Sequence, residues 1–159
     1  MLDKLNYTGN VSITKVSKGK KLSTKFYNNG TDLLFKAYAM ALQGQDISYL
    51  LPAYVDIKSG GETGTSILNS SGVSVVRSVL LEEESNPDNI TVGTEVPCTR
   101  ISATLTAANI SDGGGSQNLC LTLETKSRGL LAYTFIDSSI IDITTGTQLF
   151  IVWDLYISN

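Results

Sequence analysis

Short runs in which apolar residues alternate with polar ones recur from end to end of this 159-residue chain, and they constrain its fold more than any other feature. Each run is rich in β-branched or aromatic residues, and clusters of Gly, Asn, Asp and Ser separate the runs. A period of two places successive side chains on opposite faces of a strand. The pattern predicts eight strands, at residues 10–16, 21–27, 53–58, 72–81, 98–107, 118–126, 129–137 and 147–157.

Eight short strands predict an all-β fold, mainly an antiparallel β-sandwich. The length suits a single domain over residues 1–159, and no internal repeat or long linker divides the chain. The last predicted strand is apolar on both faces, because Leu149 and Ile151 alternate with Phe150 and Val152. We expect such a strand at the centre of its sheet, covered on both sides.

One segment departs from the alternation and predicts a short, apolar α-helix near residues 31–43. Thr31 or Asn29 can cap its start, and Asp32 suits the positive end of the helix dipole. Gly44 can close the helix, because glycine adopts the left-handed conformation that often follows a last turn.

The predicted helix carries more apolar surface than one sheet face can cover. We expect its broad apolar face to pack on the sandwich; this face comprises Leu34, Phe35, Tyr38, Ala41 and Leu42. Lys36 and Gln43 form a narrow polar wedge. The remaining stripe of Leu33, Ala37 and Met40 lies either in a deep groove of the same domain or under another subunit. These three residues are the candidate protein contact.

The composition gives little support for an enzyme. The chain has no histidine, which removes Ser-His-Asp and Cys-His catalysis and His-ligated zinc. The glycines of residues 59–66 lack the spacing of a phosphate-binding loop, and the acidic run at residues 82–88 lacks the spacing of a Ca²⁺ loop. We therefore expect no catalytic residue, no cofactor and no metal.

The two cysteines, Cys98 and Cys120, are predicted to be free. Each falls in the outward set of its strand, since Ile101 and Leu121 belong to the apolar sets. A hairpin around residues 109–118 would place the two thiols roughly 20 Å apart along the strands. This spacing excludes a disulfide.

Charge and hydropathy restrict the partners. The net charge of −3 gives no footprint for nucleic acid, and the N-terminal lysines are spaced like the solvent side of strands: Lys15, Lys18, Lys20, Lys21 and Lys25. No apolar run is long enough to span a membrane, and the first ten residues do not resemble a signal peptide. We expect synthesis in a cytoplasm without export by a standard route.

Two parts of the chain resemble small structural proteins of tailed bacteriophage particles: "KLSTKFYNNGTDLLFKAYAMALQG" (21–44) and "GTQLFIVWDLYISN" (146–159). The resemblance implies a non-enzymatic virion component, such as a capsid decoration, head-fibre, collar or tail protein. It also implies self-association and contacts with other virion proteins, in a protein made in the bacterial cytoplasm and located in the virion.

The alternative function is a carbohydrate- or receptor-binding module. Such a module would use three long loops, at residues 59–72, 82–97 and 109–118, because long loops on a rigid sandwich commonly carry binding sites. These loops contain no aromatic residue, so a glycan ligand has no specific support.

Overall fold

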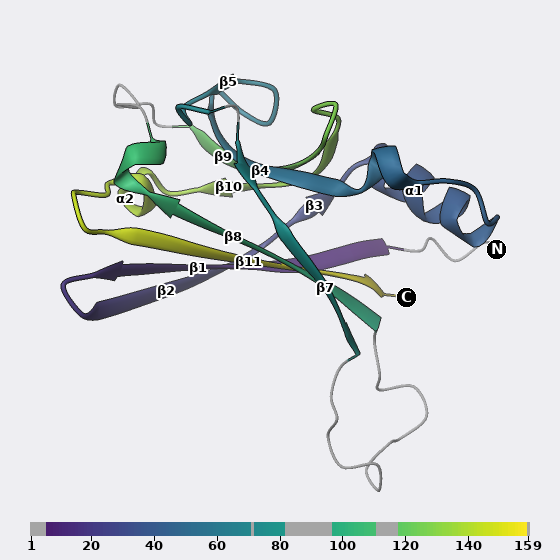
Figure 1. The fold of residues 1–159 in the computed structure, drawn as a ribbon, viewed down its shortest axis with the longest axis horizontal. Helices are drawn as coiled ribbons and strands as arrows, with labels where there is room; N and C mark the ends of the chain where they lie inside the picture. Colours follow the sequence, from purple (N-terminus) through teal and green to yellow (C-terminus); the bar gives the residue numbers. More distant parts are fainter. Residues whose placement is uncertain (1–5, 71, 82–96, 111–117, 159) are drawn as a thin grey trace, which may run out of the picture.

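A computed structural model describes residues 6–70, 72–81, 97–110 and 118–158. It confirms an all-β sandwich of two antiparallel sheets, which lie one above the other in Figure 1. Sheet A has the strand order β2-β1-β11-β8-β7 and sheet B the order β3-β10-β9-β4-β5, with β6 also paired to β4. The strands are β1 (Asn6–Ser17), β2 (Lys20–Tyr27), β3 (Asn29–Gly30), β4 (Pro52–Ser59), β5 (Thr65–Ser66), β6 (Val73–Ser74), β7 (Val76–Leu81), β8 (Pro97–Thr106), β9 (Leu119–Thr125), β10 (Leu130–Ile136) and β11 (Gln148–Ser158).

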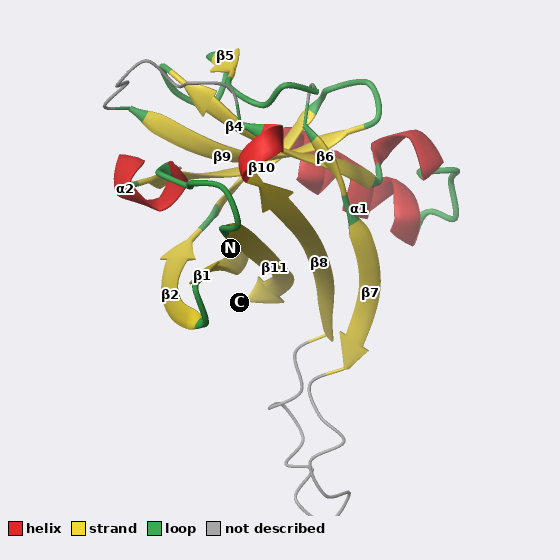
Figure 2. Cartoon of the chain, turned by 60° about the vertical axis from the view of Figure 1, so that its left-hand side comes forward, coloured by secondary structure: helices red, strands yellow, loops and turns green. Residues whose placement is uncertain are grey.

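All eight predicted strands are present, but the prediction for residues 72–81 covers two of them. β6 pairs with β4 in sheet B, and after the single residue Val75 the chain enters sheet A as β7 (Figure 2). A similar crossing joins β2 of sheet A to β3 of sheet B through Asn28. Both crossings link an edge of one sheet to an edge of the other, and alternation alone did not reveal them.

The core lies between the sheets and follows the predicted alternation. In sheet A, Val11 of β1 and Ile101 of β8 flank Trp153 of the central strand β11, and all three are fully buried. In sheet B the inner residues include Val55, Ile57, Leu119, Leu121 and Leu123. The central position of β11 is therefore confirmed.

The prediction that β11 is covered on both faces is wrong in part. On the outer face of sheet A, the side chain of Phe150 is 39% exposed and Val152 is only half-buried. Their neighbours across the sheet are small polar residues, such as Thr14 and Thr104 beside Phe150. Within the part of the chain that the structure describes, no element packs over this face closely enough to bury Phe150.

Two helices lie at opposite ends of the sandwich: α1 (Asp32–Leu42) and α2 (Ser138–Ile141) (Figure 1). Leu33 and Leu34 of α1 pack against the core, as do Ile140 and Ile141 of α2. Each open end of the sandwich is thus partly closed by apolar side chains of a helix.

The expected hairpin between the strands on either side of residues 109–118 does not form. β8 belongs to sheet A and β9 to sheet B, so Cys98 and Cys120 lie on strands of different sheets. Cys120 is free, as predicted, but it is fully buried although it belongs to the outward set of β9. The side chain of Cys98 lies outside the described residues.

Candidate functional site

The N-terminus of α1 is attached to sheet B. Thr31 is the N-cap residue, and its backbone N–H donates to the Leu131 carbonyl at 2.9 Å. Its hydroxyl donates to the carbonyls of Leu130 and Leu131 rather than capping the helix. At the other end, Gly44 (φ +70°) follows the C-cap residue Gln43, as the sequence predicts for a helix stop. The start of the helix is therefore held against β10 by three hydrogen bonds.

The inward face of α1 differs in part from the expectation: Leu34 packs against the core as predicted, whereas Phe35 and Leu42 are exposed. Ala37 is buried, Met40 is half-buried, and Leu33 packs against the core. Leu33 comes so close to Gly129 that a Cβ atom there would lie 2.6 Å from Leu33 Cδ2. The stripe of Leu33, Ala37 and Met40 is therefore largely packed on its own domain, which is the first of the two arrangements expected for it. A contribution of these residues to a contact with another subunit stays a prediction.

The opposite side of α1 is the exposed one. Phe35, Ala39 and Leu42 recur at intervals of three or four residues and share one face, and the exposed fractions of Phe35 and Leu42 are 37% and 72%. Beside α1, Tyr49 of the 3₁₀ turn η1 (Ser48–Leu50) is 51% exposed, and its hydroxyl donates to Met40 Sδ at 3.6 Å. We define the α1 surface as Phe35, Ala39, Leu42 and Tyr49.

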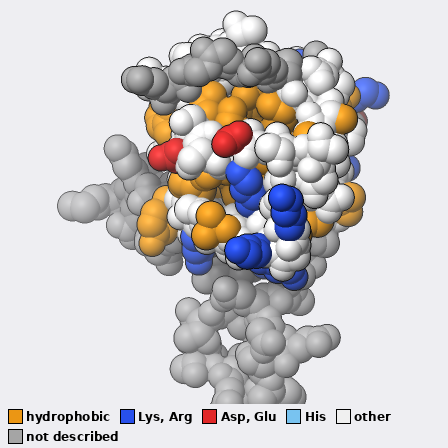
Figure 3. Space-filling model, turned by 90° about the vertical axis from the view of Figure 1, so that its left-hand side faces the viewer, with side chains coloured by type: hydrophobic (Ala, Val, Ile, Leu, Met, Phe, Trp, Pro, Cys, Tyr) orange, Lys and Arg blue, Asp and Glu red, His pale blue; other side chains and the backbone are white. Residues whose placement is uncertain are grey.

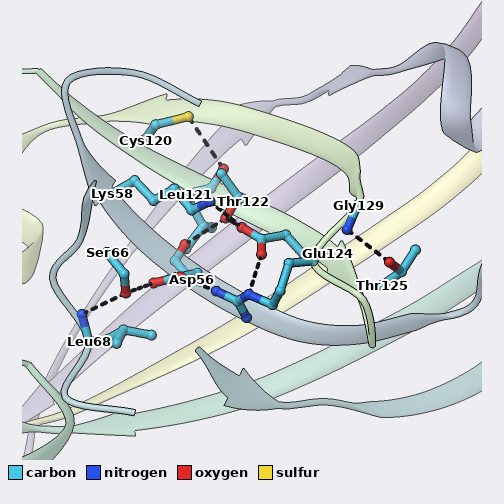
Figure 4. Close-up of polar contacts among 11 residues, drawn as sticks. Asp56, Lys58, Ser66, Leu68, Cys120, Leu121, Thr122, Glu124, Thr125 and Gly129 are labelled. Carbon is cyan, nitrogen blue, oxygen red and sulfur yellow. Dashed lines mark hydrogen bonds and ion pairs between the residues drawn. The ribbon is translucent and has the colours of Figure 1, made fainter. Parts of the chain in front are cut away.

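The outer face of sheet B carries a second feature, a cluster of four charged residues of which the two acids are buried (Figure 4). Asp56 on β4 and Glu124 on β9 are both fully buried. Lys58 Nζ lies 2.8 Å from Glu124 Oε1, and Arg128 bridges the two acids through Nη2 to Asp56 (2.5 Å) and Nε to Glu124 (3.0 Å). We call Asp56, Lys58, Glu124 and Arg128 the charge cluster; its formal charge is zero.

Hydroxyl groups complete the cluster. Ser66 of β5 donates to Asp56 Oδ1 at 2.7 Å, and Thr122 donates to Glu124 Oε1 at 2.7 Å. The guanidinium of Arg128 also lies over the ring of Tyr54, 5.2 Å from its centroid. Buried carboxylates are costly unless they are paired and hydrogen-bonded. Asp56 meets both conditions, whereas Glu124 accepts a hydrogen bond only at Oε1, and its Oε2 is held by the ion pair with Arg128 alone.

The backbone of Arg128 shows that its position is constrained. Its φ of +70° lies in the left-handed region, where a residue other than glycine costs about 1–3 kcal/mol. Arg128 closes the turn between β9 and β10, with its N–H donating to the Thr125 carbonyl at 3.0 Å. The turn directs the guanidinium back over the sheet, where the ion pairs offset the strain.

The first predicted binding loop, residues 59–72, is largely attached to the domain. It contains β5, and Ile67 and Leu68 belong to the core. The Asn69 side chain donates to the Ala108 carbonyl at 2.6 Å, which joins this segment to the turn η3 (Ala107–Asn109). Residues 82–96 and 111–117, which make up most of the other two loops, lie outside the described residues.

The described residues provide no catalytic constellation. Among them, no group of three or more His, Cys, Asp or Glu side chains could hold a metal ion. Cys120 is a poor nucleophile, since burial raises the pKa of its thiol to about 11. Across residues 6–70, 72–81, 97–110 and 118–158, no helix is long and apolar enough to cross a membrane.

The sequence analysis did not predict the charge cluster, although the alternation of the strands does place its residues on the outer face. Asp56, Lys58 and Glu124 all fall at outward positions of their strands, and only the pairing of β4 with β9 brings them together. Comparison with known proteins gives no match: no protein-family model fits the chain, and neither a curated protein nor a solved structure matches it.

Proposed function

We propose that this protein is a non-enzymatic structural component of a bacteriophage virion, associated with the capsid or the tail, that acts through protein–protein contacts. The resemblance of residues 21–44 and 146–159 to small phage structural proteins suggests the setting. The exposed α1 surface supports the mode of action, because apolar side chains on a rigid element favour association with another protein.

The observation that carries the proposal is the 72% exposure of Leu42 in a helix whose opposite side is already packed on the domain. Phe35 shares this face of α1, and Tyr49 is exposed next to the helix, where it contacts Met40. Burial of such a surface is driven by removal of apolar area from water, so association depends little on salt. The partner is a second copy or another virion protein.

Two measurements test the proposal. Sedimentation of wild type and Leu42→Lys, at several concentrations, tests self-association through the α1 surface. A tagged copy supplied during infection by the phage that carries this sequence tests incorporation into particles. We expect wild type to co-purify with particles and Leu42→Lys to be depleted by about tenfold, with an unchanged melting temperature.

Lys36→Glu is the matched control, because Lys36 is an exposed residue of the same helix outside the α1 surface. Particles without any tagged wild-type protein would refute the virion assignment. Equal incorporation of wild type and Leu42→Lys would refute the role of the α1 surface. Specific retention of wild type on a glycan array would instead favour the binding-module alternative.

A further inference from the structure

The charge along this chain is unevenly distributed. Residues 4–31 contain six lysines and no acidic residue, so this segment contributes +6 to a chain of net charge −3. The remainder of the chain contributes −9. Half of the twelve cationic residues of the chain therefore lie in this N-terminal segment.

The fold gathers four of these lysines at the end of the sandwich that holds α2. Lys18, Lys20 and Lys21 lie at the turn between β1 and β2, and all three are exposed. Figure 3 shows this end of the molecule, with Lys and Arg side chains gathered beside hydrophobic ones and two acidic groups. Lys15 is engaged there, since its Nζ donates to the carbonyls of Ser139 and Asp142.

The acidic groups at this end do not neutralise the lysines. Asp137 and Asp142 flank α2, and the Asp137 carboxylate accepts from the Ser139 N–H at 2.8 Å. That hydrogen bond lowers the pKa of Asp137, so the group is fully ionised at neutral pH. Among the described residues at this end, the four lysines (Lys15, Lys18, Lys20 and Lys21) outnumber the two carboxylates and leave a local excess of positive charge.

The same strand also presents an open edge. β2 is the last strand of sheet A and pairs only with β1 among the described strands of that sheet. Its far end is closed, because the Thr134 hydroxyl of β10 donates to the Tyr27 carbonyl at 2.8 Å. Nearer the turn, Leu22 is 67% exposed between Lys21 and Ser23. A peptide that pairs here would meet backbone groups, lysines and one apolar side chain.

We propose that the β2 edge binds an extended, acidic segment of a partner protein by strand addition. Backbone hydrogen bonds along Lys20–Lys25 would supply the pairing, as in other cases of strand addition. Carboxylates on one face of the added strand would meet Lys21 and Lys25, which share the outer face of sheet A, and an apolar residue on the other face would cover Leu22. The charge complementarity identifies the partner as acidic.

This inference does not depend on the α1 surface. α1 lies at the opposite end of the sandwich, and an association through it would be insensitive to salt (Figure 1). Binding at the β2 edge is electrostatic and weakens as salt rises. The two contacts are therefore distinguished by their salt dependence as well as by their residues.

The test uses the full-length protein and a fluorescein-labelled eight-residue peptide of alternating Glu and Val, with fluorescence anisotropy as the readout. We expect saturable binding at 50 mM NaCl that weakens by about tenfold or more at 500 mM. Lys21→Glu/Lys25→Glu, which changes the two lysines that share the outer face of sheet A, should reduce the affinity by a further factor of about ten. Lys36→Glu/Lys126→Glu, which changes two exposed lysines elsewhere by the same charge, should change it by less than about twofold.

Four outcomes would overturn the proposal. A Gln–Val peptide that binds as well as the Glu–Val peptide would remove the electrostatic basis, and a proline-containing variant that still binds would remove the strand pairing. Duplex DNA that binds as tightly as the peptide would mark the edge as a general polyanion surface. Lysines on an edge strand also discourage unwanted pairing, and if that is their only role the acidic peptide will not bind.

Discussion

The outer faces of the two sheets carry ion pairs of similar geometry in different surroundings. On sheet A, Arg100 meets Asp154 with two nitrogen–oxygen distances of 2.8 and 2.9 Å, and both side chains keep part of their exposure. On sheet B, Arg128 meets two carboxylates that are fully buried. Geometry alone therefore does not indicate how much an ion pair matters. The difference lies in what remains when one partner is removed: a solvated group on sheet A, and uncompensated buried charge on sheet B.

The largest effect is expected for Arg128→Met. The substitution leaves Asp56 and Glu124 buried with Lys58 as their only remaining cation in the charge cluster, and loss of a buried partner typically costs 3–5 kcal/mol. Because the Arg128 side chain is 32% exposed, we expect the lower end, about 3 kcal/mol. Urea unfolding measures this loss.

Arg100→Met is the matched control for Arg128→Met. It removes the same functional group from the other sheet. If the two variants lose equal stability, the contrast between the faces is wrong. Arg128→Lys tests the contrast further, because lysine keeps the charge but cannot contact two carboxylates in a fixed fork. We expect it to lose less stability than Arg128→Met and more than Arg100→Met.

The second effect contrasts the two sides of α1. Leu33→Ala should cost about 2 kcal/mol, since Leu33 packs on Gly129 and the core, whereas Leu42→Ala should cost less than about 0.5 kcal/mol. Thermal unfolding of the two variants tests which side of α1 packs on the domain. A larger loss for Leu42→Ala would restore the original assignment of the inward face.

The third effect is smaller. Asp154→Ala should cost no more than about 1 kcal/mol, because the partner Arg100 is 46% exposed and regains water. The loss should shrink further at 0.5 M salt, which screens exposed pairs. A salt-independent loss above 2 kcal/mol would mean that the outer face of sheet A is as closed as that of sheet B.

The smallest effect on stability at neutral pH concerns Cys120. In the native protein its thiol should react slowly with iodoacetamide at pH 8, and quickly once the chain is unfolded in urea, because burial raises the pKa to about 11 from 9.0. The neutral thiol is favoured in the folded state. Its contribution to stability is therefore complete below pH 9 and is lost as the pH rises through about 11.

Cys120→Ala isolates this pH dependence, since the difference in stability between wild type and variant cancels the titration of the other groups. Peptide mapping by mass spectrometry locates the label. Rapid native labelling of Cys120 would show that the outer face of sheet B is open to solvent.

The sequence determined the strands well because alternation is a local signal. Leu119, Leu121 and Leu123 mark the inner face of β9 wherever that strand is placed. The partners of each strand are not local. The alternation of residues 98–107 and 118–126 would also suit a single hairpin, yet their strands lie in different sheets. Nothing in their alternation distinguishes the two arrangements.

The prediction of which side of α1 packs on the domain was wrong in part for a related reason. Both sides of α1 are apolar, so periodicity offered two solutions of similar quality. The choice is made by Thr31, whose hydrogen bonds to β10 fix the rotation, and by Gly129, which leaves room for Leu33. Neither contact is visible without the pairing of distant segments. The charge cluster was not predicted for the same reason: β4 and β9 are separated by about sixty residues, and only their pairing brings the charged residues together.

The placement of β11 between β1 and β8 has a kinetic consequence. During synthesis, β1 (residues 6–17) is made early, but it cannot pair with β11 until residues 148–158 have been synthesised. Until then β1 and β8 each expose an unpaired edge, and such edges are prone to pair with other chains. Pairings of this sequence separation also slow folding. A released chain that ends at Gly146 should therefore contain all the strands of sheet B but lack the centre of sheet A, and chaperones should bind it more strongly than the full-length chain.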